Sequence, residues 1–309
     1  MNLNNLQYLV ALADQRHFGK AAAACGVSQP TLSAQIRKLE AELQVEVVER
    51  GTRPLLLTAV GERIVGRART ILREAVDIGE IARASGENGQ GTLRLGVFPT
   101  LGPYLIPHVM PQMRTRFPKL EMQLVEAKTS QILADLTAGD LDVGILALPV
   151  SVPGLRVERL FAEEFLLAVP ATRPPLPSPV DMSALAGEHM MLLEEGHCLR
   201  EQALAVCQIA GVAEGEFRAT SLEMLRQMVA AGSGATLLPR LAVTPPVPAN
   251  PDLRTYPFAG IAPRREIGML WRQSHAQRRF FPQLADVFRT VADEVLGQDA
   301  DPTHAGATL

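Results

Sequence analysis

The chain has 309 residues, of which 47% are hydrophobic and 20% charged. One domain usually has about 100–200 residues, so this length suggests two or three domains, and the composition excludes a disordered chain or a small disulfide-stapled scaffold. The formal net charge of -3 gives no sign of a polyanionic partner, so DNA binding must be argued from a local pattern. No apolar run approaches the ~20 residues that cross a membrane, and the N-terminus lacks a secretion signal. We therefore expect a soluble, cytoplasmic protein without a membrane partner.

Residues 1–58 predict a set of short helices. Alanine dominates residues 18–25, Gly26 breaks that pattern, and Ser28 is a good N-cap for the next helix. Pro30 falls in the first turn of that helix, where a missing N–H costs nothing. Two helices joined by a short turn with glycine, the second with a polar outer face, form a helix-turn-helix arrangement.

The polar face of this last helix carries side chains that suit the base edges and phosphates of DNA. The candidate contacts are Ser28, Gln29, Pro30, Thr31, Ser33, Arg37 and Lys38, with Arg50 and Arg53 in the following turn as a wing. Residues 1–58 hold six Lys or Arg against five Asp or Glu, so charge adds little to this interpretation. A protein-binding module with a solvated helix face stays open as an alternative.

A long helix is predicted over residues 59–84. Large apolar residues repeat every seven positions at Leu57, Ile64, Ile71 and Ile78. A strict heptad makes a narrow seam that one helix cannot bury alone, so we expect it to pair with a second copy, although a helix lying on its own domain would also show apolar residues. Residues 85–91, rich in Gly, Ser and Asn, are predicted to be a flexible hinge.

Residues 92–296 alternate between strands and helices, which predicts an α/β domain with a parallel sheet and crossover helices. The first series has strands at 92–98, 121–126 and 142–146, with helices near 101–117 and 129–138. The second series has strands at 165–169, 190–193, 217–219 and 235–238. A strand at 266–271 and a last helix near 276–295 are expected to return to the first sheet, and residues 297–309 are predicted to be a disordered tail.

The cysteines are Cys25, Cys198 and Cys207. A disulfide framework needs more cysteines and usually an even number of them. Residues 199–209 contain no helix breaker, which places Cys198 at or just before a helix N-terminus. The helix dipole and free N–H groups there favour the thiolate, and a protonated His197 or nearby Arg200 would add to the effect. A thiolate is the species that attacks peroxide to give a sulfenic acid.

Helix geometry separates Cys198 from Cys207. Nine residues of helix correspond to a rise of about 13–14 Å, whereas a disulfide needs Cα atoms within about 7 Å. A bond between these cysteines would therefore require the helix to unwind, and it would act as a conformational switch. The simpler alternative is that Cys207 is a core residue and Cys198 an incidental thiol.

The segment FGKAAAACGVSQPTLSAQIRKLEAELQVEVVERGTRPLLLTAVGE resembles the N-terminal domain of LysR-type transcriptional regulators over nearly its whole length. The resemblance implies an all-α winged helix-turn-helix domain, a linker helix that pairs two chains, and an α/β effector domain of two lobes like those of periplasmic binding proteins. It places lobe I at about residues 92–162 and 267–296, and lobe II at about 163–266.

The segments EEGHCLREQALAVC and FRATSLEMLRQMVAAGSGATLLP are similar to the effector domain of the hydrogen-peroxide-sensing members of this family. The similarity implies that Cys198 is peroxidatic and Cys207 resolving, and that their reversible disulfide remodels the effector domain. Cys25 matches no redox motif and is predicted to be a packed core residue. Thr100 and Thr129 also lie where α/β folds place ligand contacts. The implied peroxide pocket is Thr100, Thr129, Gly196, His197 and Arg265, the last with its register open because Arg264 is adjacent.

By resemblance the partners are double-stranded operator DNA, hydrogen peroxide, a second copy of the chain in a dimer and a homotetramer, RNA polymerase and a thiol reductant. No cofactor and no metal is expected. The protein is predicted to be an activator of oxidative-stress genes and not an enzyme. The alternatives are a LysR-type regulator that senses a small metabolite with inert cysteines, and a thiol peroxidase, against which the helix-turn-helix and the heptad argue.

Overall fold

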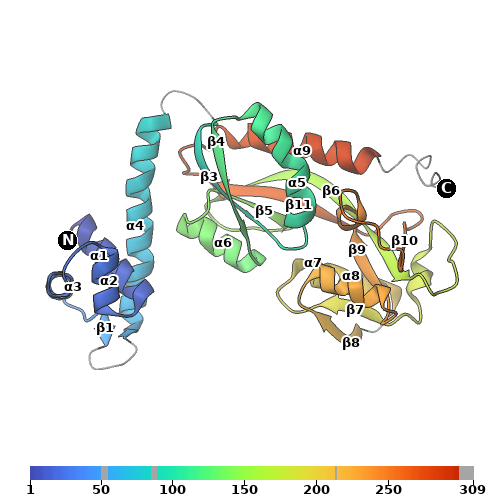
Figure 1. The fold of residues 1–309 in the computed structure, drawn as a ribbon, viewed down its shortest axis with the longest axis horizontal. Helices are drawn as coiled ribbons and strands as arrows, with labels where there is room; N and C mark the ends of the chain where they lie inside the picture. The colour runs from blue at the N-terminus through green and yellow to red at the C-terminus, as the bar shows by residue number, and fades with distance from the viewer. Residues whose placement is uncertain (50–54, 85–88, 213, 299–309) are drawn as a thin grey trace. The chain divides into compact units, whose positions relative to one another are not determined.

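The structure is a computed structural model that describes residues 1–49, 55–84, 89–212 and 214–298 (Figure 1). The chain divides into an N-terminal unit, residues 1–86, and a C-terminal unit, residues 87–137 and 141–309. Arg50, Arg53 and most of the predicted hinge lie outside the described residues.

The N-terminal unit is helical, with a small two-stranded sheet. Its elements are α1 (Leu3–Gln15), α2 (Phe18–Ala24), α3 (Gln29–Leu43), β1 (Val48–Glu49), β2 (Leu56–Leu57) and α4 (Ala59–Ala84). The apolar faces of α1 and α3 enclose a core that includes the fully buried Leu9, Leu12, Leu32 and Leu39. The predicted helices and the predicted N-cap at Ser28 are confirmed, and the antiparallel pair β1–β2 is the base of the wing.

The first half of the C-terminal unit builds the larger sheet. Its elements are β3 (Gly91–Val97), α5 (Gly102–Arg116), β4 (Leu120–Glu126), α6 (Thr129–Ala138), β5 (Val143–Leu148) and β6 (Leu155–Pro170). Glycines let α6 pack directly on the sheet, since a Cβ on Gly144 would lie 2.8 Å from side-chain atoms of Ile132 and Leu136. Helix α5 covers the opposite face (Figure 1).

The second half adds a smaller α/β lobe and then returns to the first sheet. Its elements are η1 (Met182–Leu185), β7 (Met190–Leu193), α7 (Cys198–Ala210), β8 (Glu214–Ala219), α8 (Leu222–Ala230), β9 (Thr236–Pro239), η2 (Arg240–Val243), β10 (Leu253–Tyr256), β11 (Arg264–Arg272) and α9 (Phe281–Gln298). The predicted strands of this lobe all occur, but β10 was not predicted.

The prediction of a parallel sheet is only partly correct. Strand β3 is parallel to β4 and β5, whereas β11 runs antiparallel to both β5 and β6. Strand β6 is also longer than the predicted 165–169: its first part pairs with β11, and its last residues pair with β9 and β10. The charged residues in LRVERLFAEE disguise the first part, because Glu and Arg are poor indicators of a strand. The one strand therefore belongs to both lobes.

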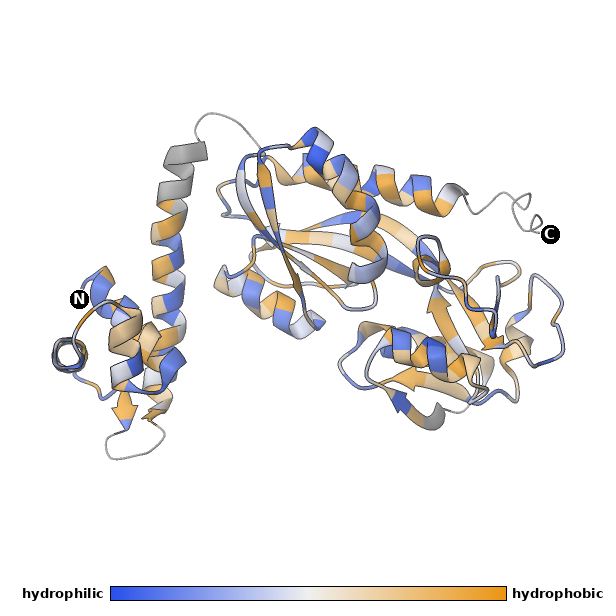
Figure 2. Cartoon of the chain, in the orientation of Figure 1, coloured by the Kyte–Doolittle hydropathy of each residue, from blue (hydrophilic) through white to orange (hydrophobic). Residues whose placement is uncertain are grey.

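The last helix differs from its prediction at both ends. Helix α9 begins at Phe281 and not near residue 276, because residues before it form turns in which His275 Nδ1 accepts a hydrogen bond from the N–H of Gln277 at 3.0 Å. Pro282 then suits the first helical turn. The helix continues to Gln298, so the predicted tail starts too early, and residues 299–309 lie outside the described residues. Figure 2 shows hydrophobic and hydrophilic residues alternating along α9, as expected for a helix with one buried face.

Candidate functional site

The end of β3 places a threonine hydroxyl against a buried arginine. Thr100 follows β3 at the carboxyl edge of the parallel strands, where α/β proteins usually bind ligands. Only 1% of Thr100 is exposed; its Oγ1 accepts a hydrogen bond from Arg265 Nη1 at 3.0 Å, and its carbonyl oxygen accepts one from Arg265 Nη2 at 3.0 Å. Because the arginine is the donor in both bonds, the O–H of Thr100 stays available to a ligand.

A buried ion pair fixes the orientation of Arg265. Glu163 Oε2 accepts a hydrogen bond from Arg265 Nε at 2.7 Å, and Glu163 Oε1 accepts one from the N–H of Leu241 at 2.8 Å. The guanidinium also lies over the ring of Phe98, 5.2 Å from its centroid. A buried charge pair with this many partners is held in one geometry. Arg264 is exposed, so Arg265 and not Arg264 is the arginine that contacts Thr100.

A small pocket lies where the N-terminus of α7 meets these residues. It is lined by Phe98, Pro99, Thr100, Lys128, Thr129, Gly196, His197 and Cys198. Thr129 begins α6, and Gly196, with φ +87°, turns the chain into His197, the N-cap of α7. The structure thus brings the predicted pocket residues together, with Arg265 behind Thr100. Their roles toward a ligand stay predictions.

The expectation that Cys198 favours the thiolate is wrong for this form of the protein. Burial raises the pKa of the Cys198 thiol, and the charge of Arg265 and the backbone N–H groups at the helix start oppose this only in part. Burial, together with the charge of Lys128, lowers the pKa of His197, so its imidazole adds no positive charge at neutral pH. Arg200 donates instead to the carbonyl at the end of β7, at 3.2 Å. The sequence indicated the helix N-terminus but not the burial of the thiol.

The second cysteine lies on the same unbroken helix. Cys207 is 1% exposed and packs in the core, and no disulfide joins it to Cys198 in this structure. Helix α7 confirms the predicted helix over 199–209 and includes Cys198 as its first residue. A helical rise of about 13–14 Å separates the two Cα positions, about twice the separation that a disulfide allows. The first turns of α7 must therefore unwind before these sulfurs can meet.

Sequence reasoning missed the lysine at the edge of this pocket. Lys128 Nζ donates a hydrogen bond to Glu194 Oε1 at 2.9 Å and another to the carbonyl oxygen of Glu195 at 3.1 Å. The Lys128 charge holds the pKa of the Glu194 carboxyl below its usual value. No local signal marks this pair, because only the fold brings residues so far apart in sequence into contact.

The predicted DNA-contacting face of α3 is open to solvent. Its exposed members are Ser28, Gln29, Pro30, Thr31, Arg37 and Lys38, and Ser33 is half-buried. Ser28 Oγ caps the helix by accepting a hydrogen bond from the N–H of Thr31 at 3.3 Å. Among the described residues, neither Arg37 nor Lys38 has an ion-pair partner, so both cations are free to meet phosphates.

Two side chains fix the base of the wing. Glu40 is buried, and its Oε1 accepts a hydrogen bond from the N–H of Val47 at 2.9 Å. Thr58 Oγ1 donates to the carbonyl of Glu46 at 2.7 Å and accepts from the N–H of Gly61 at 2.9 Å, which caps α4. Residue 61 must be glycine here, because a Cβ would lie 2.2 Å from the carbonyl oxygen of Val47. These contacts join the end of α3, the wing and the start of α4.

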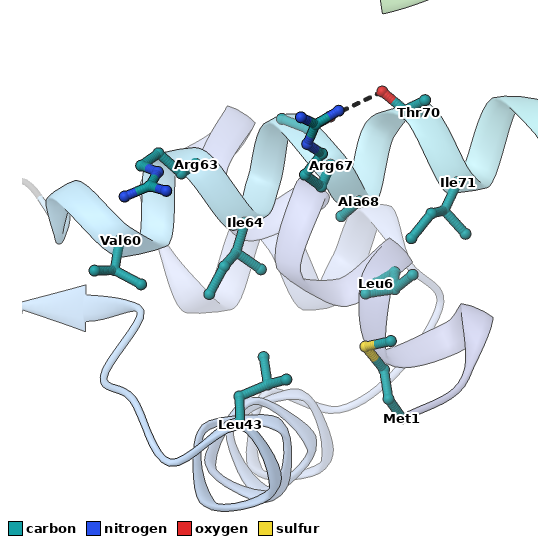
Figure 3. A pocket seen from close by; sticks show the side chains of 11 residues that line it. Met1, Leu6, Leu43, Val60, Arg63, Ile64, Arg67, Ala68, Thr70 and Ile71 are labelled. Carbon is teal, nitrogen blue, oxygen red and sulfur yellow. Dashed lines mark hydrogen bonds between the residues drawn. The ribbon is translucent and has the colours of Figure 1, made fainter.

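An apolar groove of about 650 Å³ lies along α4 in the N-terminal unit (Figure 3). It is lined by Met1, Leu6, Leu43, Val60, Arg63, Ile64, Gly66, Arg67, Ala68, Thr70 and Ile71. Further along α4 the exposed fraction is 58% for Val76 and 68% for Ile78. Of the heptad residues, Ile71 is 42% exposed and Ile78 is thus largely exposed to solvent among the described side chains.

The remaining expectations about sites have simple outcomes. Cys25 is partly buried and packs against the core of the N-terminal unit. Within the described ranges, no group of three His, Cys, Asp or Glu side chains could hold a metal ion. None of the helices in the part of the chain that the structure describes has both the length and the hydropathy of a membrane span.

Two family models match the chain. Residues 3–62 match the bacterial regulatory helix-turn-helix protein of the lysR family, and residues 86–293 match the LysR substrate binding domain. Among curated proteins, the DNA-binding transcriptional dual regulator OxyR of Escherichia coli K12 is 49% identical over 295 residues, which cover 95% of this chain and 96% of the relative. The hydrogen peroxide-inducible genes activator of Haemophilus influenzae is 42% identical, covering 96% of this chain and 97% of the relative.

Solved structures give the same result. A full-length OxyR from Pseudomonas aeruginosa, in a variant with aspartate in place of one cysteine, has a TM-score of 0.76 and 37% identity, with 94% of this chain and 95% of that chain covered. A hydrogen-peroxide-bound OxyR of Corynebacterium glutamicum, in a cysteine-to-serine mutant, has a TM-score of 0.67 and 32% identity, covering 100% of this chain and 98% of that one. The matches extend over the helix-turn-helix, the long helix and both lobes. The chain therefore belongs to the LysR family of bacterial transcriptional regulators.

Proposed function

We propose that this chain is a hydrogen-peroxide-sensing DNA-binding regulator, switched by a reversible Cys198–Cys207 disulfide. The observation that carries the proposal is the pocket at the start of α7, which puts Cys198 beside Thr100, Thr129 and His197, with the second thiol further along the same helix. The high identity to peroxide-inducible regulators supports it.

In the first step, the Cys198 sulfur attacks one oxygen of hydrogen peroxide. An S–O bond forms and the O–O bond breaks, so that the sulfur is oxidised to sulfenic acid and the departing hydroxide takes up a proton to become water. The neutral His197 can accept the thiol proton. The O–H of Thr100, polarised by Arg265, can donate to the departing oxygen, since fixed donors stabilise charge that develops in a transition state.

In the second step, the Cys207 sulfur attacks the Cys198 sulfur. An S–S bond forms, the S–O bond breaks, and hydroxide leaves with the Cys207 proton as a second water. The two steps together convert two thiols and one peroxide into one disulfide and two waters. Because an intact α7 keeps the sulfurs apart, the product cannot retain this helix, and oxidation changes the shape of the effector domain.

The N-terminal unit would deliver this change to DNA. The proposed domains are the winged helix-turn-helix at 1–58, the linker helix at 59–84, the hinge at 85–91 and the effector domain at 92–296. The exposed polar face of α3 would lie in the major groove, and the uncovered heptad of α4 would pair with a second copy of the chain. The proposal also includes a tetramer on operator DNA, contact with RNA polymerase and activation of oxidative-stress genes. A cellular thiol system would reduce the disulfide, and the protein would be cytoplasmic.

The test combines disulfide mapping with footprinting of the full-length protein on a target promoter. After a pulse of hydrogen peroxide, mass spectrometry should find a peptide pair linked through Cys198 and Cys207, and the footprint should change. Cys198→Ser should bind DNA but give no change, whereas Cys207→Ser should stop at the sulfenic acid. A peroxide response that survives in Cys198→Ser would reject the proposal.

The alternatives make different predictions. A metabolite sensor with inert cysteines would show no linked peptide after the pulse of hydrogen peroxide. A thiol peroxidase would turn over repeatedly with a reductant. Proteins similar to this chain over nearly its whole length are transcriptional regulators, which favours the switch over the enzyme.

A further inference from the structure

Lys128 reaches from one lobe to the loop that carries Cys198 in the other. It lies between β4 and α6, and its Nζ binds both Glu194 Oε1, at 2.9 Å, and the carbonyl oxygen of Glu195, at 3.1 Å. Its aliphatic stem covers Gly196, where a Cβ would lie 3.2 Å from Lys128 Cδ. One side chain thus contacts each residue of the turn that leads from β7 toward α7.

Two hydrogen bonds at the start of this turn lie within its own lobe. The N–H of Glu194 donates to the carbonyl of Ala219 at 2.9 Å, in continuation of the β7–β8 pairing, and Arg200 holds the carbonyl of Leu193 at 3.2 Å. These bonds can move with the lobe. The contacts of Lys128 cannot, because they tie the turn to the segment before α6. Lys128 therefore adds a polar tie between the turn and the segment that carries Thr129, beside the packing of the pocket residues.

We propose that Lys128, through Glu194, is a positioning residue for the disulfide step: it holds the Cys198 turn in its reduced arrangement and slows the approach of Cys198 to Cys207. The inference rests on the proposed function, since it concerns the second of its two steps. The attack on peroxide is measured separately, because Lys128 also lines the pocket and its charge lowers the pKa of His197.

The Lys128–Glu194 contact should affect the rate of disulfide formation, because that step moves the turn. The attack on peroxide exchanges S–H for S–O without moving the backbone, so the turn keeps its contacts. The attack of Cys207 on the sulfenic sulfur, with loss of water, requires the turn to leave its position, and the Lys128–Glu194 pair must break on the way. A variant that lacks the ion pair does not need to break it, so both the activation free energy and the reaction free energy of disulfide formation are lower. The side chains of both partners are 41% exposed, so the effect should be modest.

The test measures the two steps separately in the full-length protein. Sulfenic acid formation is followed by dimedone trapping in a Cys207→Ser background, and disulfide formation by thiol alkylation and mass spectrometry after a peroxide pulse that saturates the first step. The variants are Glu194→Ala and Lys128→Met. The matched control is Glu195→Ala, which removes one carboxylate from the neighbouring residue of the same turn but leaves its carbonyl contact intact.

Once the sulfenic acid has formed, we expect Glu194→Ala to close the disulfide roughly two to five times faster than wild type, as for the loss of an exposed ion pair. Lys128→Met should close it at least as fast, and Glu195→Ala should behave as wild type. Closure in the wild type should also accelerate with added salt, which screens exposed charges, whereas closure in Glu194→Ala should not.

Two outcomes overturn the inference, and they differ in what else they reject. If Glu194→Ala and Glu195→Ala close at the same rate, with a linked peptide present in both, Lys128 does not position the turn and the proposed function stands. If no linked peptide forms in any protein, wild type included, the proposed function fails and this inference fails with it.

Discussion

At the scale of single residues, the site holds the Cys198 thiol in surroundings that disfavour its ionisation. Burial raises the pKa of Cys198, while Arg265 and the N–H groups at the helix start oppose the shift. The reduced protein therefore keeps this sulfur mainly as a thiol at neutral pH. The donors that would assist peroxide cleavage are nevertheless in place, because the Glu163–Arg265 pair orients the hydroxyl of Thr100.

The raised pKa of Cys198 predicts a pH profile. Because the thiolate is the nucleophile and its fraction grows about tenfold per pH unit below the pKa, sulfenic acid formation should accelerate with pH across the range 6–9 without a plateau. The rate of dimedone trapping in Cys207→Ser at a fixed peroxide concentration measures this. A rate that is already constant above pH 6 would show that Cys198 is a thiolate in the reduced protein.

Asp142 gives the second prediction at this scale. Burial alone would raise its pKa, but hydrogen bonds from His275 and Arg94 outweigh that effect and lower the pKa to about 2 from its usual 3.8. The folded pKa is the lower one, so the carboxylate contributes stability above about pH 4 that is lost as the pH falls toward 2. Asp142→Asn should reduce the free energy of unfolding by about 2 kcal/mol at pH 7 and flatten its dependence on pH between 4 and 2.

Urea unfolding followed by the fluorescence of Trp271 measures the effect of Asp142→Asn. Trp271 is the one tryptophan of the sequence, and it pairs with Val143, the residue that follows Asp142. Glu121→Gln, an exposed carboxylate on β4, is the matched control and should change the free energy by less than about 0.5 kcal/mol. Equal losses in both variants would contradict the role of Asp142.

At the scale of elements, local patterns were sufficient where the determinants lie close together in the sequence. Ser28, Gly26 and the apolar spacing identify α3, and the run without breakers after Cys198 identifies α7. No local pattern indicated the contact of Glu40 with the wing, of Lys128 with Glu194 or of Glu163 with Arg265. Each contact joins chain segments that only the fold brings together. The pKa of Cys198 was misjudged for the same reason, as burial is a tertiary property.

The uncovered heptad of α4 predicts a dimer. Ile78 is 68% exposed although it continues the seven-residue repeat of Ile64 and Ile71, and a glutamate there would introduce like charges into a paired seam. Ile78→Glu should dissociate the dimer at micromolar concentration, as measured by sedimentation equilibrium. Ile261→Glu, which replaces an isoleucine that is 94% exposed in the C-terminal unit, is the control and should leave the oligomer unchanged. A dimer that persists in Ile78→Glu would place the interface elsewhere.

At the scale of the whole molecule, the order of the units could be predicted, but the topology of the large sheet could not. The alternation of strands and helices indicated the parallel strands β3, β4 and β5. The antiparallel return of β11 and the length of β6 were hidden, because the charged residues within 155–164 disguise a strand. The sheet is therefore mixed, and its central strands come from distant parts of the chain.

Strand β6 has a mechanical consequence for any switch in this molecule. From Leu155 to Glu164 it pairs with β11, with one register shift opposite Ile267 and Gly268, and from Phe165 to Pro170 it pairs with β9 and β10. If the two lobes closed on each other as rigid bodies, strand β6 would have to bend and its backbone hydrogen bonds to neighbouring strands would break. A helix outside the large sheet, such as α7, can unwind while strand β6 keeps its conformation. The paired strand thus confines a change of shape to segments outside the sheet, such as α7.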